Sequence, residues 1–223
     1  MDLFETIAQG DVAAARDLLA ADPALGRARH PEQRVSPVLW AMYQHRFDLA
    51  RALAVQLDQL GQPLDLHEAA ALDAADRVGA LLDRGAHVDA RSPDGFTPLQ
   101  LAAYFGAPAA AALLIERGAA VDAVADNPQR IAPLHAAVAG QHPEVVRLLL
   151  AAGALPDLRQ PGGWTPLLAA ARHGHAEIVA ALLDGGADPT ATNDEGVRPA
   201  ELARSHGHPD IAALIEQAGL ARA

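Results

Sequence analysis

The sequence predicts an all-α solenoid built from short helix–turn–helix units that are joined by projecting hairpins or loops. Two series of residues repeat at about 33 residues. Glycines that follow apolar stretches are separated by 33, 35, 33 and 33 residues: Gly85, Gly118, Gly153, Gly186 and Gly219. Prolines that precede apolar stretches are separated by 35, 33 and 33 residues: Pro98, Pro133, Pro166 and Pro199. In both series the one longer spacing, of 35 residues, falls in the same part of the chain, from Gly118 to Gly153 and from Pro98 to Pro133. Residues 119–132 therefore contain an insertion.

The composition agrees with thin layers of helices. Hydrophobic residues make up 51% of the 223 residues, whereas aromatic residues make up only 4%. The apolar residues are mostly Ala and Leu, which are good helix formers with small or unbranched side chains. Gly and Pro are scattered and never form a run, so no flexible linker divides the chain. We therefore expect one continuous body with helix-on-helix packing.

Each unit can be followed along the chain. In Thr97-Pro98 and Thr165-Pro166, a hydroxyl residue suited to the N-cap precedes a proline suited to the first helical position. A glycine eight residues after the proline ends a first helix of about two turns: Gly106, Gly174 and Gly207. A more apolar second helix follows, as in residues 144–150 and 177–183. The next segment is rich in Asp, Pro and Gly, as in residues 89–95, and predicts a turn.

These units resemble ankyrin repeats. The resemblance is carried by five motifs: Thr97-Pro98-Leu99, Ala132-Pro133-Leu134-His135-Ala136-Ala137, Thr165-Pro166-Leu167, Gly174-His175 with Glu177-Ile178-Val179, and Gly186-Ala187-Asp188. It is specific from Leu66 to Leu220. Ser36 to Ala41 looks like the same helix start, but the step from Pro37 to Asp65 is only 28 residues, which predicts a shortened hairpin.

The resemblance implies a single domain over residues 1–223, with the first and last units as caps. The first cap is a terminal unit at Asp2 to Ala21. The chain divides into seven units of similar length: 1–30, 31–63, 64–94, 95–129, 130–162, 163–195 and 196–223.

The histidines fall at repeated positions, which favours a structural role. His142, His175 and His208 follow the first helix of successive units, where the resemblance implies a turn histidine that bonds backbone. His67 and His135 match the family's Thr-Pro-Leu-His motif, which implies contacts between neighbouring units. A zinc site needs three or four ligands that converge from different elements. We expect no metal site and no cofactor.

Charge and motifs exclude several other functions. The 28 acidic residues outnumber 17 basic ones, all of them Arg, so nucleic acid is not expected as a partner. Nucleophile, phosphate-loop and metalloprotease motifs do not occur, and an enzyme is not expected. Acids at the predicted hairpins are typical of turns that bond their own backbone: Asp94, Asp122, Asp126, Asp157 and Asp194.

The start of the sequence lacks the pattern of a signal peptide, and no long apolar run predicts a membrane span. Cysteine is absent, which suits a reducing compartment. We expect a cytoplasmic protein, with an exported effector as the open alternative. The absence of Lys and the abundance of Ala and Arg indicate a GC-rich, bacterial coding bias.

The resemblance implies a concave face, built from hairpin tips and first helices, that binds a partner protein. The family's variable positions there are expected to bind the partner: Arg91, Phe96, Tyr104, Phe105, Arg130, Ile131, Arg159, Trp164, Arg172 and His173. Four of the eight aromatic residues and four arginines fall in this set, which is typical of an interaction hot spot. Tyr43 is a possible extension, whereas Trp40 and Phe47 are expected in the core.

The expected partner is an acidic or mixed acidic and apolar segment, which inserts between the aromatic rings while the arginines pair with its charges. The simpler alternative is that these rings pack against neighbouring hairpins and helices. Two other functions stay open. One is a metal- or small-molecule-responsive protein that uses exposed histidines, and the other is a structural solenoid that associates with itself, although we expect a monomer.

Overall fold

The computed structural model describes residues 2–222, which form fourteen α-helices, two short 3-10 helices and no β-strand. The α-helices pair along the chain. The first two pairs are α1 (Leu3–Gln9) with α2 (Val12–Ala21) and α3 (Pro37–Tyr43) with α4 (Phe47–Gln59). The other pairs are α5 (Leu66–Ala71) with α6 (Ala75–Asp83), α7 (Pro98–Phe105) with α8 (Pro108–Glu116), α9 (Pro133–Ala139) with α10 (Pro143–Ala151), α11 (Pro166–His173) with α12 (Ala176–Asp184), and α13 (Pro199–Ser205) with α14 (Pro209–Arg222). The 3-10 helices are η1 (Pro23–Arg27) and η2 (Pro161–Gly163).

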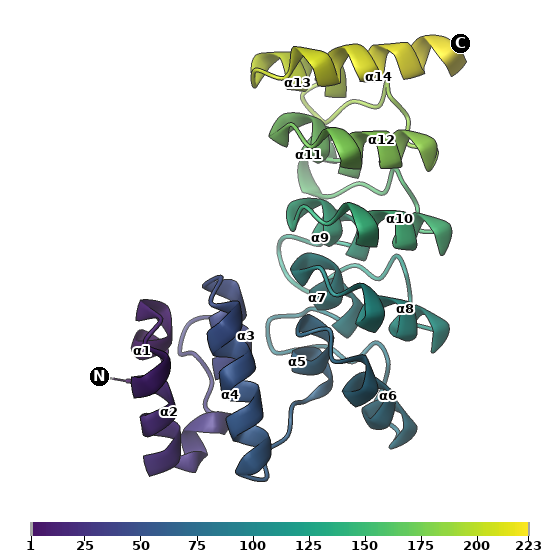
Figure 1. Cartoon of the computed structure of the whole chain (residues 1–223). Helices are drawn as coiled ribbons and strands as arrows, with labels where there is room; N and C mark the ends of the chain where they lie inside the picture. The colour runs from purple at the N-terminus through teal and green to yellow at the C-terminus, as the bar shows by residue number, and fades with distance from the viewer. Residues whose placement is uncertain (1, 223) are drawn as a thin grey trace.

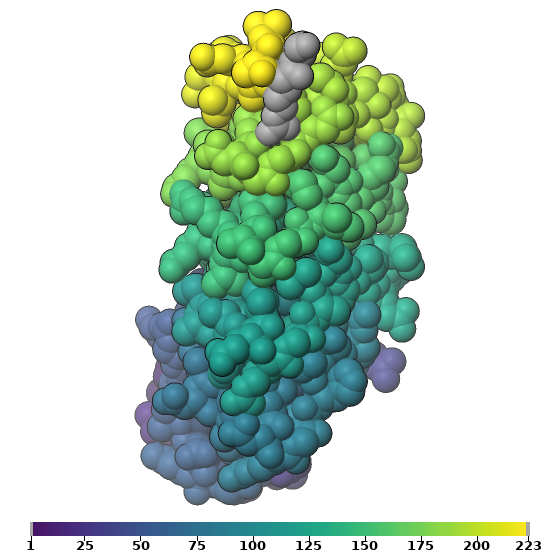
Figure 2. Space-filling model, turned by 90° about the vertical axis from the view of Figure 1, so that its right-hand side faces the viewer, coloured from purple at the N-terminus to yellow at the C-terminus, as the bar shows by residue number. Residues whose placement is uncertain are grey.

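The helix pairs from α5 to α14 stack in a column, while α1 to α4 stand beside its N-terminal end with their axes turned across it (Figure 1). Seen from the side, the molecule is an elongated body along which the later units follow one another (Figure 2). Each first helix packs on the first helix of the next pair, and the second helices do the same except at the step from α4 to α6, where no comparable contact occurs. The all-α solenoid predicted from the sequence is confirmed.

The predicted helix starts and stops are present where the sequence places them. The hydroxyls of Thr97 and Thr165 accept hydrogen bonds from the backbone N–H groups of Gln100 and Leu168, both at 3.3 Å. Proline occupies the first helical position after each of these caps. Gly106 ends α7 in the left-handed conformation that glycine adopts without strain.

Two hydrophobic cores hold the molecule together. The larger core runs through the stacked units and contains many fully buried Ala and Leu side chains, such as Leu99, Leu134 and Leu167. A second core lies among α1 to α4, and it reaches the stack through Ala71 of α5 and Leu101 of α7. Because the Ala side chains are small, neighbouring helices approach closely, as the composition predicts.

The segments that join one helix pair to the next project to one side of the stack, and we call them fingers. Three fingers have similar lengths: residues 84–97, 152–165 and 185–198. The finger between α8 and α9 is longer, at residues 117–132, in agreement with the predicted insertion. In contrast, α4 and α5 are joined by residues 60–65 alone, so the shortened hairpin predicted there is confirmed.

Acidic side chains connect successive fingers, which corrects part of the sequence-based interpretation. Asp122 accepts a hydrogen bond at 3.0 Å from the backbone N–H of Leu155, and Asp157 accepts one at 3.0 Å from that of Asp188. Asp89 accepts in the same way from Ala120 at 3.1 Å. These carboxylates therefore bind the backbone of the following unit rather than of their own turn.

We expect the Asp157→Ala substitution to lower the free energy of unfolding by about 1 kcal/mol, because a charge-assisted bond between two units is lost. Urea unfolding followed by circular dichroism measures the effect. Asp184→Ala is the control, since this exposed carboxylate at the end of α12 makes no such bond. An equal loss in both variants would contradict a structural role for the hydrogen bonds between aspartate side chains and the backbone of the next finger.

No helix within residues 2–222 combines the length and the apolar character that crossing a membrane requires.

Candidate functional site

A groove of about 500 Å³ lies on the finger side of the molecule, between the N-terminal helices and the repeat stack. One wall is the loop before α3, and the other walls are α3, α7, the start of α9 and the fingers before α7 and α9. The side chains that shape the floor are largely aromatic or aliphatic: Val35, Trp40, Tyr43, Phe96, Leu101, Tyr104 and Ile131. A concave, mainly apolar surface of this size is typical of a binding site.

The groove lies where a finger is missing. Elsewhere a finger stands beside the next one, as residues 84–97 stand beside residues 117–132: the backbone N–H of Asp126 donates to Gly95 O at 3.0 Å. Between α4 and α5 only residues 60–65 connect the units, so the finger 84–97 has no such neighbour on its other side. The loop before α3, at Glu32 to Val35, borders the resulting space.

Tyr43 links the N-terminal helices to the stack across the groove floor. Its hydroxyl donates to Asp94 Oδ2 at 3.2 Å, and Ser92 Oγ donates to Asp94 Oδ1. The Tyr43 ring also lies 6.2 Å from the Tyr104 ring and 5.2 Å from the Phe105 ring. Burial, together with the neighbouring Asp94 charge, raises the pKa of the Tyr43 phenol above its usual value, so the hydroxyl stays protonated.

Three of the ten predicted partner-binding residues line this groove: Phe96, Tyr104 and Ile131. Phe105 lies behind it, with its ring 5.0 Å from that of Tyr104 in an edge-on contact. All four side chains are half-buried rather than fully exposed. The groove is lined by helices of the second, fourth and fifth pairs, whereas the sequence-based site extends over units four to six.

Two aromatic residues of the second helix pair were expected in the core. Trp40 is half-buried; it packs against the N-terminal core and also lines the groove. Its ring stacks on His30 at 4.0 Å, and its Nε1 donates to Phe4 O at 3.0 Å. The expectation for Phe47 is wrong, because this first residue of α4 is 39% exposed. At the first position of a helix the side chain has no preceding turn to cover it.

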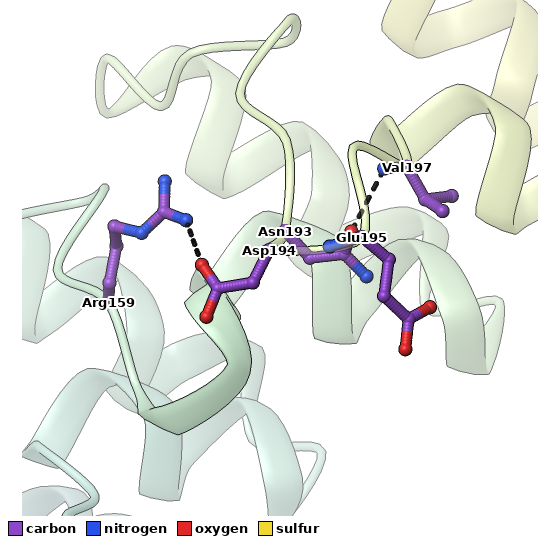
Figure 3. Close-up of polar contacts among 5 residues, drawn as sticks. All are labelled: Arg159, Asn193, Asp194, Glu195 and Val197. Carbon is purple, nitrogen blue, oxygen red and sulfur yellow. Dashed lines mark hydrogen bonds and ion pairs between the residues drawn. The ribbon is translucent and has the colours of Figure 1, made fainter.

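The arginines of the predicted site are mostly engaged within the molecule. Arg159 Nη2 pairs with Asp194 Oδ1 at 2.9 Å, from one finger to the next (Figure 3). The Arg172 guanidinium lies 5.5 Å from the Trp164 ring, and Arg91 Nη1 donates to Gly95 O at 3.2 Å. Arg130 is exposed, and within residues 2–222 its side chain makes no ion pair.

Trp164, Arg172 and His173 lie outside the groove, on and before α11. Trp164 is half-buried under Arg172, and the exposed His173 ring stacks on His175 at 5.9 Å. The predicted site is thus divided into a groove and a separate set of residues on α11.

Two of the repeated histidines, one in α5 and one just before α10, contact backbone of a neighbouring unit, as their positions predict. His67 Nε2 donates to Ala90 O at 2.9 Å, and His142 Nε2 donates to Tyr104 O at 3.1 Å. Among the described residues, no such hydrogen bond is made by the side chains of His135, His175 and His208. Burial lowers the pKa of His142, and its bond to Tyr104 partly opposes this shift. No group of three or more His, Asp or Glu side chains suited to a metal ion occurs in the described part of the chain.

His135 is the most deeply buried histidine, with 4% of its surface exposed. Burial lowers its pKa to about 4, while the nearby backbone of Trp164 and Leu158 opposes the shift. In the preceding unit Gln100 occupies the equivalent position, and its Nε2 donates to Ala123 O at 2.7 Å and to Ile131 O at 2.6 Å. Both side chains therefore face the backbone of the following finger.

The family model described as ankyrin repeats (3 copies) matches residues 66–160 and 134–220, which is more than half of the chain. The matched region begins at α5 and leaves out α3 and the loop before it, which form walls of the groove. No curated protein matches the sequence.

Proposed function

Because the chain belongs to the ankyrin-repeat family, we propose that it binds a segment of a partner protein in the groove between its N-terminal helices and its repeat stack. Ankyrin repeats are generally protein–protein interaction modules and are typically non-catalytic. The observation that carries the proposal is the apolar, aromatic-lined groove at the position of the missing finger. An extended segment or a loop of a partner would occupy the space that a finger occupies elsewhere.

The floor of the groove has the composition of an interaction hot spot. Tyr and Trp side chains offer large contact areas at a small cost in conformational entropy. Trp40, Tyr43 and Tyr104 lie together here, although the chain has only eight aromatic residues in total. Desolvation of these rings by a partner supplies the binding free energy, and the polar rim supplies specificity.

The acidic partner expected from the sequence is less well supported than the groove itself. Its charges were to pair with Arg91, Arg130, Arg159 and Arg172. Three of these four side chains already contact Gly95, Asp194 or Trp164. Only Arg130, which stands between the groove residues Gln129 and Ile131, is left for such a role. We therefore base the proposal on the apolar floor and not on the arginines.

A bulky side chain at the groove mouth tests the proposal. Peptides are selected from a random phage-displayed library against the full chain, and their affinities are measured by fluorescence polarisation. We expect Gln129→Trp to weaken the selected peptides at least tenfold, because the new ring fills the groove that Gln129 lines.

Glu195→Trp is the matched control. Glu195 occupies the equivalent place, four residues before the helix proline, on the exposed tip of the finger before α13 (Figure 3). Its substitution should change affinity by less than twofold. Equal effects of the two substitutions, or a library that yields no peptide, would reject the groove as the binding site.

A further inference from the structure

Asp94 carries a negative charge into the groove without a cationic partner. Its carboxylate is half-buried, and the groups that bond it are the neutral hydroxyls of Tyr43 and Ser92. No ion pair to Asp94 exists anywhere in residues 2–222. An ionised carboxylate has about four acceptor positions, so roughly two stay available for another donor.

Another finger of the same molecule shows that an acid near a fingertip can pair with an arginine of the preceding finger. Asp194, on the finger before α13, pairs with Arg159 of the preceding finger at 2.9 Å (Figure 3). Asp94 lies on the finger before α7, and the preceding connection consists of residues 60–65 alone. Asp94 lies four residues before the helix proline, as Glu195 does, and is therefore not at the same position as Asp194. It nevertheless has no preceding finger beside it that could place a cation against its carboxylate, and the groove lies on that side.

We infer, on the premise that the groove binds a partner segment, that this segment places an arginine or lysine side chain against Asp94. The apolar stem of that side chain would lie against the rings of Tyr43 and Tyr104, which are 6.2 Å apart beside the carboxylate. Aromatic faces attract cations, most strongly where water is displaced. The partner segment thus fills the space of the missing finger and brings a cation to Asp94.

The charges around the groove agree with a cationic occupant. The charged residues that line it are Glu32, Arg34 and Asp94, so two of the three are acidic. Arg34 and Glu32 lie two residues apart on the loop before α3, whereas Asp94 lies at the aromatic floor. The whole chain carries a formal charge of -11, which favours the approach of a basic segment over long distances.

Arg34 is the one arginine among the residues that line the groove with Asp94, so it is the competitor to test. It lines the main groove and also a smaller neighbouring cavity together with Asp94, but it makes no ion pair with this carboxylate. If Asp94 awaits a cation from a partner, removal of Arg34 should strengthen binding, because a like charge leaves the site. If Arg34 instead helped to hold an acidic partner, its removal would weaken binding.

The test uses the selected peptides with four forms of the full chain. We expect basic residues to be enriched among the peptides, Asp94→Asn to weaken their affinity about tenfold, and Arg34→Ser to strengthen it about threefold. Asp126→Asn is the matched control, since this exposed acid lies on the next finger outside the groove lining and should have no effect.

A peptide in which the basic residue is replaced by alanine completes a double-mutant cycle with Asp94→Asn. The two changes should not be additive, and this coupling separates direct pairing from any loosening of the Tyr43 and Ser92 contacts. Groove-dependent peptides that lack basic residues, or peptides insensitive to Asp94→Asn, would overturn the cationic occupant while leaving the proposed function in place. Peptides insensitive to Gln129→Trp would reject both.

Discussion

Replacing Gly140 by alanine is expected to lower the free energy of unfolding by roughly 2 to 3 kcal/mol, although alanine is the better helix former. A Cβ atom at this position would lie 2.1 Å from the carbonyl oxygen of Tyr104 and 2.7 Å from Cδ2 of His142. Tyr104 O is also the acceptor of the His142 hydrogen bond at 3.1 Å. The added methyl group must therefore separate the ends of α7 and α9 and break that bond.

The backbone of Gly140 is in the ordinary right-handed helical region, at φ -76° and ψ -8°, so alanine there carries no backbone strain. The loss in stability then measures the close approach of the two helices alone. Because this contact connects two neighbouring units of a solenoid, its loss should also make unfolding less cooperative between the N-terminal and C-terminal halves.

Gly79→Ala is the matched control for this prediction. Gly79 lies inside α6, and a Cβ atom there would meet nothing closer than Leu113 Cδ2 at 3.5 Å, which is an ordinary contact. We expect this substitution to raise the free energy of unfolding by about 0.5 to 1 kcal/mol, through helix propensity and the lower entropy of the unfolded chain. Urea unfolding of both variants decides the matter, and similar stabilities would contradict a tight α7–α9 contact.

The sequence predicts those features of the fold that depend on local chemistry. Thr97 and Thr165 cap their helices through hydrogen bonds within one turn, so the Thr-Pro pattern is enough to place the helix starts. The short step from Pro37 to Asp65 likewise predicts the short connection at residues 60–65. Such features need no knowledge of which units touch in space.

The groove could not be derived from the sequence, because its walls come from segments far apart in the chain. Glu32 to Val35 meets Asp94 only because the missing finger lets the loop before α3 approach the stack. Trp40 is expected in the core from its place in the repeat, and its ring does pack against the N-terminal core, but it also borders the groove where no finger covers it. The 28-residue step was the available signal, since a missing finger in a solenoid exposes the side chains that it would cover.

The arginines show a second limit of prediction from a repeat. Variable positions of a solenoid are selected for partners in some units and for contacts between fingers in others. Arg159 is expected to bind a partner and Asp194 to bond its own turn, but in the structure the two side chains bind each other at 2.9 Å. The sequence shows that the two residues are charged, but the choice between an internal and an external partner depends on the distance between fingertips.

Acidification should destabilise the protein mainly through His135. The pKa of this buried histidine falls from its ordinary value of 6.5 to about 4 in the folded chain. Between these two pH values the unfolded chain binds a proton at His135 that the folded chain does not. The contribution of His135 to the free energy of unfolding is therefore fully present above pH 6.5, and it is lost progressively as the pH decreases towards 4. At pH 5 the expected loss from this group is about 2 kcal/mol relative to pH 7.5.

His135→Gln isolates the contribution of this side chain. Gln100 occupies the equivalent position one unit earlier and donates to the carbonyl oxygens of Ala123 and Ile131, so glutamine is compatible with the site. It cannot be protonated, and the variant should lose about 2 kcal/mol less stability than the wild type between pH 7.5 and pH 5. Urea unfolding of both proteins at the two pH values measures the change in the free energy of unfolding.

Other buried groups do not disturb this comparison. Burial also lowers the pKa values of His142 and His175, which adds to the acid sensitivity of both proteins alike. Burial raises the pKa of Glu68, which acts in the opposite direction because protonation of that carboxyl favours the folded chain as the pH decreases. Since wild type and variant share these three groups, any difference between the two proteins in the stability lost from pH 7.5 to pH 5 comes from His135. Equal losses would mean that this ring accepts a proton inside the fold as readily as in water.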